Sequence, residues 1–495
     1  MILKKLLIYV VTYNHEDFIE RTLSRIDERL FDNYETEIVV NDDSSKDNTL
    51  RILKNIKNNF NKKVQFTILS NPMNLGYGGN QKIGYFYAIK NNFDYVVLLH
   101  GDGQYKPEIM GDLLEVLQKE NASAVFGSRM ISKFGALKGG MPIYKFIGNK
   151  ILTYLQNKIL KSNLSEFHSG YRVYDVQALK KIPFYLNSND FSFDTEIIIQ
   201  FLILKLKISE ISIPTYYGKE ISYVNGIYYA FRIIIESLKS NIQKYGILYE
   251  KKYDLIVKEI KYVYKKNFIS THSVTYKTIK DNSLILDIGS GQGDLIKHLV
   301  SEKNCKVVGI DKDIKAMSSK NIELVSCNLN KDLPKLDYLK FDYILFLDVI
   351  EHLDSPEDFL KKLYEKISDN EKLEILISTP NISFFIIRFM LLFGFFNYGK
   401  RGILDKTHTR LFTFQSFKRL IEDSNYKIIK MSGIPAPFPI AIGENLLSKI
   451  LIDFNNLAII IWKSFFSYQI LCKIKPNKSL NLLLKEAEKK ISNIA

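Results

Sequence analysis

Cysteine is scarce in this 495-residue chain, which has three: Cys305, Cys327 and Cys472, all in the second half. None of them belongs to a Cys-x-x-Cys pair, which argues against a disulfide framework and against a zinc site. Such sparing use of cysteine is typical of a reducing compartment. We therefore expect a cytoplasmic protein.

Long apolar runs are missing as well. No clean stretch of about 18 apolar residues occurs, the length that a membrane-spanning helix needs. The nearest candidate, residues 382–396, is interrupted by Arg388 and Gly394. A helix packed on the core is the favoured interpretation, and a peripheral contact with the inner face of a membrane is the alternative. The opening segment MILKKLLIYVVTYN has too short an apolar part for a signal peptide, and no small-residue cleavage site follows it.

Positive charge is in excess, with a formal net charge of +15. Such an excess is compatible with nucleic acid, anionic lipid or phosphorylated substrates as partners. The basic residues are spread along the chain, so a general compositional bias explains the charge at least as well. Because no arginine-rich or aromatic-interleaved patch occurs, we expect no nucleic-acid partner.

The order of apolar segments predicts two α/β domains, because strand-like and helix-like segments alternate in two separate series. Expected strands of the first series lie at residues 2–11, 37–40, 64–69 and 95–99, and those of the second at 284–288, 306–310, 341–347 and 373–378. We expect both domains to be doubly wound. The expected parts are a first domain at 1–243, a helical connector at 244–280, a second domain at 281–475 and an amphipathic helix at 476–495, with a last edge strand at 465–474.

Polar residues follow the ends of the expected strands in the first domain, where open α/β sheets bind their ligands. Asp42 and Asp43 can accept hydrogen bonds from a base or ribose, and Gly78 allows close approach of backbone to ligand. A nucleotide diphosphate leaving group develops negative charge, which a divalent cation held by oxygen ligands neutralises. Asp102 and Gln104 can supply such oxygens, so the sequence predicts a nucleotide–metal site at this edge.

Seven segments together make the first half resemble family 2 glycosyltransferases of the GT-A fold, close to polyprenyl-phosphate sugar synthases. They are VVTYNHEDFI, VNDDSSKDNT, NPMNLGYGGNQKIG, LLHGDGQYKP, FGSRM, SEFHSGYRVY and FSFDTEI. The resemblance implies an inverting transfer from a UDP- or GDP-sugar, with Mg²⁺ or Mn²⁺, to a lipid-phosphate or glycan acceptor. The residues it assigns to the nucleotide sugar are Thr12, Tyr13, Asn14, Asp42, Asp43, Asn74 and Gly78. It assigns Asp102 and Gln104 to the metal–diphosphate, and Arg129 and Arg172 to phosphate or acceptor.

One position departs from this family, whose DxD motif begins with aspartate where this chain has His100. A neutral imidazole can ligate a metal, but magnesium prefers oxygen. We therefore expect Asp102 to be the main metal ligand, with His100 and Gln104 as further ligands. A phosphate acceptor needs no base, whereas a sugar hydroxyl needs a carboxylate to take its proton. Glu166, Asp194 and Glu196 are candidates, and a structural pair with Arg172 is the alternative for each.

A second glycine-rich turn lies between an apolar strand and a helix, in the segment LILDIGSGQGD. Gly289, Gly291 and Gly293 let the backbone turn sharply and approach a ligand at the start of the helix. Asp287 precedes the turn and can bind the amino group of a methionine moiety. Asp311 ends the next strand, where a carboxylate can bind ribose hydroxyls. For the turn alone, a nicotinamide-binding domain is the alternative.

Further segments make this half resemble class I S-adenosylmethionine-dependent methyltransferases, which have a Rossmann-like fold: VVGID, FLDVIEHLDSPEDFL, ISTPNIS and DKTHTRLFT. The resemblance implies S-adenosylmethionine as the cofactor and a glycan or related small acceptor. Asp348 lies in the fourth-strand segment, and Asn328 stands where the family usually has an aspartate near the adenine. His352 and His408 are candidate bases for the acceptor, and a structural role is the alternative for each.

The two resemblances together imply a bifunctional transferase of surface or lipid-linked glycan biosynthesis. One domain would add a sugar, and the other would methylate that sugar or its neighbour. The alternative is that only one domain is active and that the other is a binding or scaffolding module.

Overall fold

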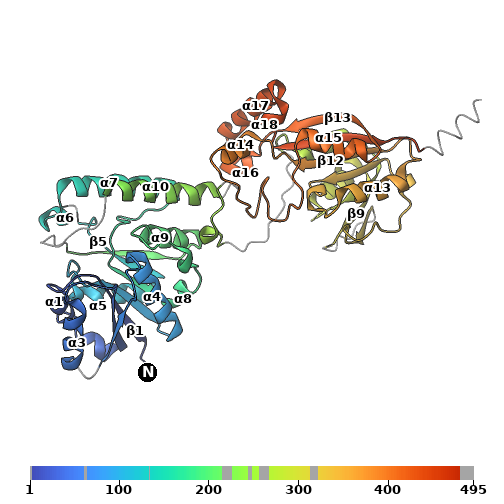
Figure 1. Cartoon of the computed structure of the whole chain (residues 1–495). Coiled ribbons are helices and arrows are strands. Elements are labelled where there is room, and N and C mark those ends of the chain that lie inside the picture. The colour runs from blue at the N-terminus through green and yellow to red at the C-terminus, as the bar shows by residue number, and fades with distance from the viewer. Residues whose placement is uncertain are drawn as a thin grey trace, which may run out of the picture. The chain divides into compact units, whose positions relative to one another are not determined.

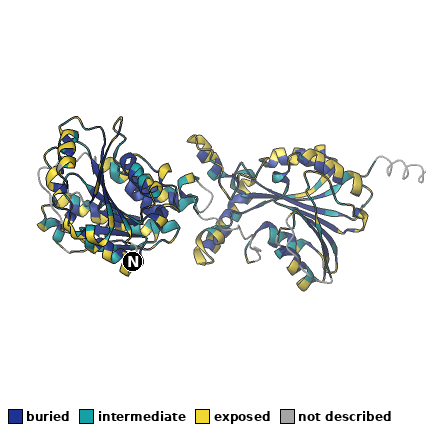
Figure 2. Cartoon of the chain, turned by 90° about the horizontal axis from the view of Figure 1, so that it is seen from below, coloured by how far each residue is buried: buried dark blue, intermediate teal, exposed yellow. Residues whose placement is uncertain are grey.

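The computed structural model describes residues 3–60, 64–132, 134–214, 226–243, 248–255, 267–291, 293–312 and 321–479. The chain forms two compact units (Figure 1). The first contains residues 1–243 and 250–258, and the second contains residues 244–249 and 259–495. In each unit the buried residues gather on a central sheet (Figure 2).

The first unit is built on a seven-stranded sheet with the order β3-β2-β1-β4-β6-β5-β7. Its first four strands run parallel, whereas β6 runs antiparallel to both of its neighbours, so the sheet is mixed. The strands are β1 Lys5–Thr12, β2 Glu35–Asp42, β3 Gln65–Ser70, β4 Tyr95–His100, β5 Ala124–Ser128, β6 Arg172–Asp175 and β7 Ile208–Ser212.

Helices cover both faces of this sheet, and successive side chains of β1 point alternately to the two layers of helices. Its apolar sequence KLLIYVVT is typical of a strand that is buried on both sides. Leu6 and Ile8 pack with α1, α3 and α5, whereas Leu7 and Tyr9 pack with α4, α8 and α9. These helices are α1 Ile19–Leu23, α3 Thr49–Asn59, α5 Met110–Lys119, α4 Tyr77–Lys90, α8 Val176–Leu179 and α9 Phe193–Ile203.

The second unit also has a seven-stranded sheet, with the order β10-β9-β8-β11-β12-β14-β13. Five parallel strands are followed by β14, which is antiparallel to both of its neighbours. The strands are β8 Leu284–Ile288, β9 Lys306–Asp311, β10 Ile322–Ser326, β11 Tyr343–Leu347, β12 Glu374–Pro380, β13 Tyr426–Ile434 and β14 Gln469–Pro476. Helices α12 Asp294–Lys303 and α11 Thr271–Thr278 pack on one face, and α13 Pro356–Ile367 and α15 Phe414–Asp423 on the other.

The expected edge strand at 465–474 is wrong in its position. Strand β14 begins later and lies between β12 and β13, so β13 forms the edge. Ile470, Cys472 and Ile474 of β14 are buried in the core, as an interior strand requires. The expected terminal helix falls mostly on residues 480–495, which lie outside the described residues.

The segment at 382–396 forms helix α14, Phe385–Leu392, which is amphipathic. Ile387 and Met390 are buried in a small cluster with Ile403 and Leu404, whereas Leu392 is exposed. Across the described residues, no helix combines the length and the apolar character that crossing a bilayer requires.

Candidate active sites

The carboxyl ends of three parallel strands bring together the first set of predicted residues. Thr12 of β1 lies opposite Asp42 of β2, and Val11 lies opposite His100 of β4. Strand β1 is flanked by β2 and β4, so the strand order reverses beside it, which is the usual place for a ligand crevice. The loop after β4 packs closely on the end of β1. A Cβ atom added to Gly101 would lie only 2.9 Å from Thr12 Oγ1.

The two neighbouring aspartates at the end of β2 differ in what they contact. Asp43 accepts hydrogen bonds from Asn71 Nδ2 at 2.7 Å, Leu75 N at 2.9 Å and Gly76 N at 3.0 Å, so it anchors the loop after β3. Asp42 accepts from Ser45 N at 3.1 Å through Oδ2. Its buried Oδ1 has no hydrogen-bond partner among the described residues. Since an unsatisfied buried acceptor is costly, Asp42 is the better placed of the two for a ligand donor.

Other residues that we predicted to contact the nucleotide sugar hold the surrounding loops together. Asn14 accepts from Lys46 N at 2.8 Å and its own backbone N–H donates to Ser45 Oγ at 2.8 Å, which joins the loops after β1 and β2; Tyr13 precedes it, partly buried. Asn74 is exposed and accepts from Gly76 N at 3.0 Å.

The expectation that Gly78 allows a ligand to approach the backbone needs correction. Its N–H donates to Asn189 O at 2.7 Å, and a Cβ at this position would lie 2.5 Å from Ser188 O. Glycine is therefore required here because the start of α4 packs against the loop at residues 188–190, within the protein itself.

A hydrogen-bonded chain connects the end of β4 with helix α9. His100 Nε2 lies 3.0 Å from Tyr77 Oη, which donates to Asp194 Oδ2 at 3.1 Å. Because the Tyr77 hydrogen points to Asp194, His100 donates its Nε2–H and keeps the lone pair of Nδ1. Burial lowers the pKa of His100 to about 3, so the imidazole is neutral near pH 7. A metal would therefore meet a neutral Nδ1 at this position.

Asp194 is a better base candidate than Glu166. Burial raises its pKa above the usual range although Arg172 opposes this, and a carboxylate with a raised pKa takes a proton more readily. Arg172 lies 3.4 Å from Asp194 Oδ1, and its side chain is fully buried. The guanidinium donates to the carbonyls of Phe167, Ser169 and Asp194. The predicted contact of Arg172 with phosphate or acceptor is therefore incompatible with this conformation.

Glu166 forms a buried ion pair with Arg129 and not with Arg172, so its predicted role as a base and the alternative pair both need correction. Its carboxylate accepts from Arg129 N at 2.7 Å, from Arg129 Nε at 2.9 Å and Nη2, and from Asn149 Nδ2 at 2.8 Å. Burial alone would raise the pKa of Glu166, but Arg129 holds it below the usual range. Glu166 thus stays ionised and fixes Arg129, whose side chain keeps 12% of its surface exposed.

Asp102 and Gln104 lie on the loop that follows β4, both partly exposed. Asp102 Oδ1 accepts from Gln104 N at 3.0 Å, which shapes the turn around Gly103. The loop packs next to the end of β1, so the carboxylate predicted to hold the metal lies at the same edge of the sheet as Thr12 and Asp42.

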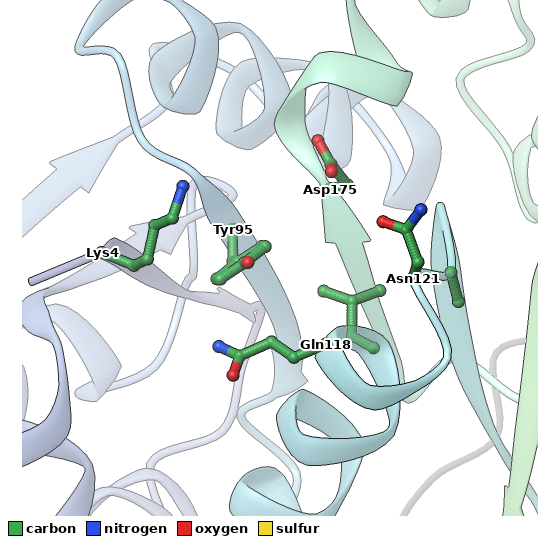
Figure 3. Close-up of a pocket in the computed structure, with 7 residues that line it drawn as sticks. Lys4, Tyr95, Gln118, Asn121 and Asp175 are labelled. Carbon is green, nitrogen blue, oxygen red and sulfur yellow. The ribbon is translucent and has the colours of Figure 1, made fainter.

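A hollow of about 320 Å³ lies at the opposite edge of this sheet (Figure 3). Lys4, Tyr95, Gln118 and Asp175 line it. Tyr95 is the first residue of β4, whereas His100 is the last. The hollow is thus separated from the polar residues by the length of the strand, and we assign it no role in the chemistry.

In the second unit, the glycine turn follows β8 as the sequence predicts. Gly289, Gly291 and Gly293 all have positive φ, between +54° and +78°, a region that favours glycine. A Cβ on Gly289 would lie 2.2 Å from Val349 Cγ2, so the turn packs tightly on the segment after β11. Gly291 N donates to Asp311 Oδ2 at 2.8 Å. Helix α12 begins directly after Gly293, so its amino end points at the turn.

Asp287 is the buried carboxyl beneath this turn. Burial, with a smaller contribution from Asp311, raises the pKa of Asp287 to about 7. A cationic ligand group would reverse this effect, because it stabilises the ionised form. Asn328 is exposed on the loop after β10, where its Oδ1 accepts from Asn330 N at 3.1 Å.

Asp348 links three strands at their ends. Its carboxylate accepts from Ser378 Oγ at 2.7 Å and from Gln469 Nε2 at 2.6 Å. These contacts join β11 to β12 and β14. Each oxygen of Asp348 accepts one of these bonds and can accept a second, so its contact with the cofactor stays a prediction.

The two candidate histidines of this unit lie together, as edge-to-face rings with centroids 4.8 Å apart. His352 ends the 3₁₀ turn Ile350–His352 after β11, and His408 lies on the loop between α14 and α15. Between them the structure places Glu351, whose buried carboxylate we did not single out from the sequence. The sequence signal for Glu351 is its position directly before His352 in the segment VIEH. Burial, with a contribution from Asp348, raises the pKa of Glu351 above the usual range.

Two protein-family models match the chain, one in each unit. Residues 7–183 match the model of glycosyl transferase family 2, and residues 264–431 match that of a methyltransferase domain. The chain joins a family 2 glycosyltransferase domain to a methyltransferase domain. Both domains belong to transferase enzymes, and each match falls wholly within one compact unit.

Curated relatives match the two domains separately. A UDP-N-acetylglucosamine–dolichyl-phosphate N-acetylglucosaminyltransferase of Methanococcus voltae is 27% identical over 43% of this chain and 86% of its own. A low-salt glycan biosynthesis hexosyltransferase of Haloferax volcanii is 30% identical over 31% of this chain and 35% of its own. In the methyltransferase domain, a ubiquinone biosynthesis O-methyltransferase of Pelagibacter ubique is 33% identical over 22% of this chain and 48% of its own.

Proposed function

We propose that the chain is a bifunctional enzyme of lipid-linked or surface glycan biosynthesis. The glycosyltransferase domain transfers a sugar from a UDP- or GDP-sugar, with inversion, to a lipid-phosphate or glycan acceptor. The methyltransferase domain transfers a methyl group from S-adenosylmethionine to a glycan. The observation that carries the proposal is that each unit presents a buried carboxylate, Asp42 or Asp287, at the carboxyl ends of its parallel strands, where α/β proteins bind ligands.

In the glycosyltransferase domain, Asp42 Oδ1 would accept a hydrogen bond from the base or ribose of the donor. Asp102, with His100 Nδ1 and Gln104, would hold Mg²⁺ or Mn²⁺. When bound, the cation would neutralise the charge that develops on the diphosphate as the sugar leaves. Arg129 keeps an exposed part beside this site and would face the negative charge of the donor or of a phosphate acceptor.

The acceptor decides whether a base is needed. A phosphate oxygen is already a nucleophile, whereas a sugar hydroxyl must lose a proton. Asp194 has a raised pKa and lies beside Tyr77, so it is suited to take that proton if the acceptor is a hydroxyl. The dolichyl-phosphate relative supports a lipid-phosphate acceptor, for which Asp194 would serve only to position Tyr77 and His100.

An exposed apolar surface supports a lipid-linked acceptor. Helices α7, Ile143–Leu160, and α10, Gly226–Ile242, pack side by side on the first unit (Figure 1). Tyr229 of α10 contacts His168 Nδ1 at 3.1 Å, and the carbonyl of His168 accepts from Arg129, so the helix pair adjoins the site. The pair exposes large apolar side chains that could contact acyl or prenyl chains at the inner face of a membrane: Ile143, Tyr144, Ile147, Ile151, Tyr154, Ile227, Tyr228 and Phe231.

The test is incubation of the full chain with a panel of nucleotide sugars, labelled S-adenosylmethionine and cell glycolipid as acceptor. Mass spectrometry should find one product that carries both an added sugar and a methyl group. Omitting the nucleotide sugar should remove both groups from that product if methylation follows glycosylation. If neither group is incorporated from any donor, the proposal is wrong.

A second candidate function is that one domain serves only to bind a ligand. The substitution of His100 for the usual aspartate is the observation that favours it for the glycosyltransferase domain. In this case the panel would show methylation without sugar transfer, and calorimetry would still detect a nucleotide sugar bound to the chain.

The lipid contact has a separate test. Co-sedimentation with vesicles that contain anionic lipid should fall markedly in Ile147→Glu and Ile151→Glu, which charge the exposed face of α7. Phe86→Glu on α4 is the matched control, because Phe86 is similarly exposed at 61% but lies on another helix. Equal sedimentation of all three variants and the wild type would refute the contact.

A further inference from the structure

A cluster of one carboxylate and two imidazoles lies after β11 in the methyltransferase domain. Ligand-type atoms of Glu351, His352 and His408 all lie within 4.8 Å of one another. His352 and Glu351 come from one 3₁₀ turn, while His408 comes from a loop more than 50 residues later in the chain. The fold therefore brings three groups of metal-ligating type to one point.

The two imidazoles are oriented by backbone carbonyls. His352 Nδ1 lies 3.0 Å from Thr407 O, and His408 Nδ1 lies 2.9 Å from Ile403 O. A carbonyl oxygen only accepts, so each Nδ1 carries the hydrogen and each Nε2 keeps its lone pair. Histidines that bind metals usually have this arrangement, because a hydrogen bond from the other ring nitrogen sets the tautomer and the ring orientation.

Glu351 supplies an independent indication that a ligand belongs here. Its residue exposure is 1%, and neither carboxylate oxygen has a hydrogen-bond partner among the residues that the structure describes. Asp348 and Asp405 nearby cannot compensate a negative charge, because they are acidic themselves. A buried carboxylate without a donor is expensive, whereas a cation bound to it offsets the cost.

The backbone holds the two parts of the cluster in place. Thr409 N and Arg410 N donate to Glu351 O at 2.8 and 3.1 Å, so the loop that carries His408 is fastened to the turn that carries Glu351. Thr409 Oγ1 also donates to Leu353 O at 2.7 Å. The three side chains are thus brought together by fixed main-chain contacts, as a preformed binding site requires.

We propose that Glu351, His352 and His408 bind a divalent transition-metal ion in the methyltransferase domain. Two imidazole nitrogens and one carboxylate suit Mn²⁺, Fe²⁺ or Zn²⁺ better than Mg²⁺ or Ca²⁺, which prefer ligand sets made of oxygen. Three protein ligands leave coordination positions open for another molecule.

The location suggests what fills the open positions. Val349, two residues before Glu351, packs on Gly289 of the turn assigned to S-adenosylmethionine, so the metal lies next to that turn. An oxygen atom of the acceptor, such as a sugar hydroxyl, would bind the metal and be positioned beside the methyl donor. This second statement rests on the proposed methyl transfer, whereas the metal site itself does not.

The experiment measures metal binding to the full chain and needs no acceptor. All measurements use a background protein that carries Asp102→Ala, because this substitution removes the metal site proposed in the glycosyltransferase domain. After chelation and dialysis, Zn²⁺ and Mn²⁺ binding is measured by calorimetry and elemental analysis. We expect one equivalent per chain, bound more tightly than Mg²⁺. His352→Ala, His408→Ala and Glu351→Gln should each weaken binding at least about 100-fold. His298→Ala, which removes a half-buried imidazole of α12 that pairs with Glu302, should not change it.

S-adenosylmethionine binding to each variant serves as the test of folding, and Glu351→Gln preserves the shape of the side chain. Absence of metal binding in the background protein would overturn the proposal, as would binding that survives all three substitutions or that is tightest for Mg²⁺. Loss of methyl transfer to every acceptor together with intact metal binding would refute the proposed function but leave the metal site standing.

Discussion

Buried acidic side chains have different surroundings in the two domains. In the glycosyltransferase domain, Glu166 faces Arg129 and Asp194 faces Arg172, while Asp43 accepts three hydrogen bonds from its own loops. In the methyltransferase domain, Glu351 has two buried oxygens without partners among the described residues, and Asp287 has another acid, Asp311, as its charged neighbour.

The difference corresponds to the charge of the expected ligands. A nucleotide sugar is anionic, so a site for it gains from Arg129, which Glu166 holds in position. S-adenosylmethionine carries an ammonium group and a sulfonium, and a metal ion is cationic, so a site for these gains from carboxylates that the protein leaves uncompensated. Glu166 and Arg129 of the first site therefore neutralise each other before any ligand binds, and Asp42, whose buried Oδ1 has no partner among the described residues, is the exception there. In the second site, Glu351 has no partner among the described residues for either carboxylate oxygen.

The largest effect should come from the metal ligands of the glycosyltransferase domain. We expect Asp102→Ala to lower sugar transfer at least about 1000-fold, because the leaving diphosphate would lose the charge that offsets its own. His100→Ala should lower it only about 10-fold, since one neutral nitrogen is lost while the carboxylate remains. Transfer or hydrolysis of the nucleotide sugar measures both. Wild-type activity of Asp102→Ala would show that the domain uses no metal at this position.

Removal of one partner of the Glu166–Arg129 ion pair should destabilise the glycosyltransferase domain. Glu166→Ala leaves Arg129 without its buried counterion, and we expect a loss of about 3–5 kcal/mol in the free energy of unfolding of this domain. Denaturant unfolding, followed domain by domain, measures it. Glu120→Ala, which removes the exposed ion pair with Lys207, should leave the free energy of unfolding nearly unchanged. Similar losses for both variants would show that the burial of the pair has no energetic importance.

The histidines of the methyltransferase domain should affect turnover without affecting the cofactor. We expect His352→Ala and His408→Ala to lower methyl incorporation into the glycolipid acceptor about 100-fold, whether they act as bases or as metal ligands. The dissociation constant of S-adenosylmethionine, measured by calorimetry, should stay within about 3-fold of wild type. A parallel loss of cofactor affinity would place these residues in the cofactor site.

The smallest effect concerns pH. The folded pKa of Asp287 is raised to about 7 by burial, so the carboxyl is largely protonated at pH 6 and ionised at pH 8. Only the ionised form attracts the ammonium of S-adenosylmethionine, so affinity should rise about 10-fold between these values. In Asp287→Asn the affinity should be weak and nearly independent of pH. An unchanged pH profile in this variant would mean that another group causes the dependence.

The raised pKa of Asp287 also affects the stability of the folded state. A carboxyl whose folded pKa lies above its unfolded value makes the folded state less stable as pH rises from about 4 to about 7. Without ligand, Asp287→Asn should therefore unfold at a higher temperature than wild type at pH 8, and the difference should vanish near pH 4. Scanning calorimetry at the two pH values provides the check.

Much of the architecture follows from the sequence alone. The strand expected at 284–288 coincides with β8, and the strands expected near residues 306 and 95 differ from β9 and β4 by one residue at the carboxyl end. The glycine turn and the polar strand ends were also visible as motifs. All of these are local features, because apolar periodicity and turn residues act over a few neighbouring positions.

Only the tertiary structure decided which charged groups meet. Tyr77 and Asp194 are 117 residues apart, Arg129 and Glu166 are 37 apart, and His408 joins Glu351 across more than 50 residues. The motifs marked most of these side chains as candidates, but not their partners, since a contact between loops depends on the order of the strands in the sheet. The same order decides that Glu166 of the first domain meets an arginine, whereas Glu351 of the second is buried with no hydrogen-bond partner among the described residues.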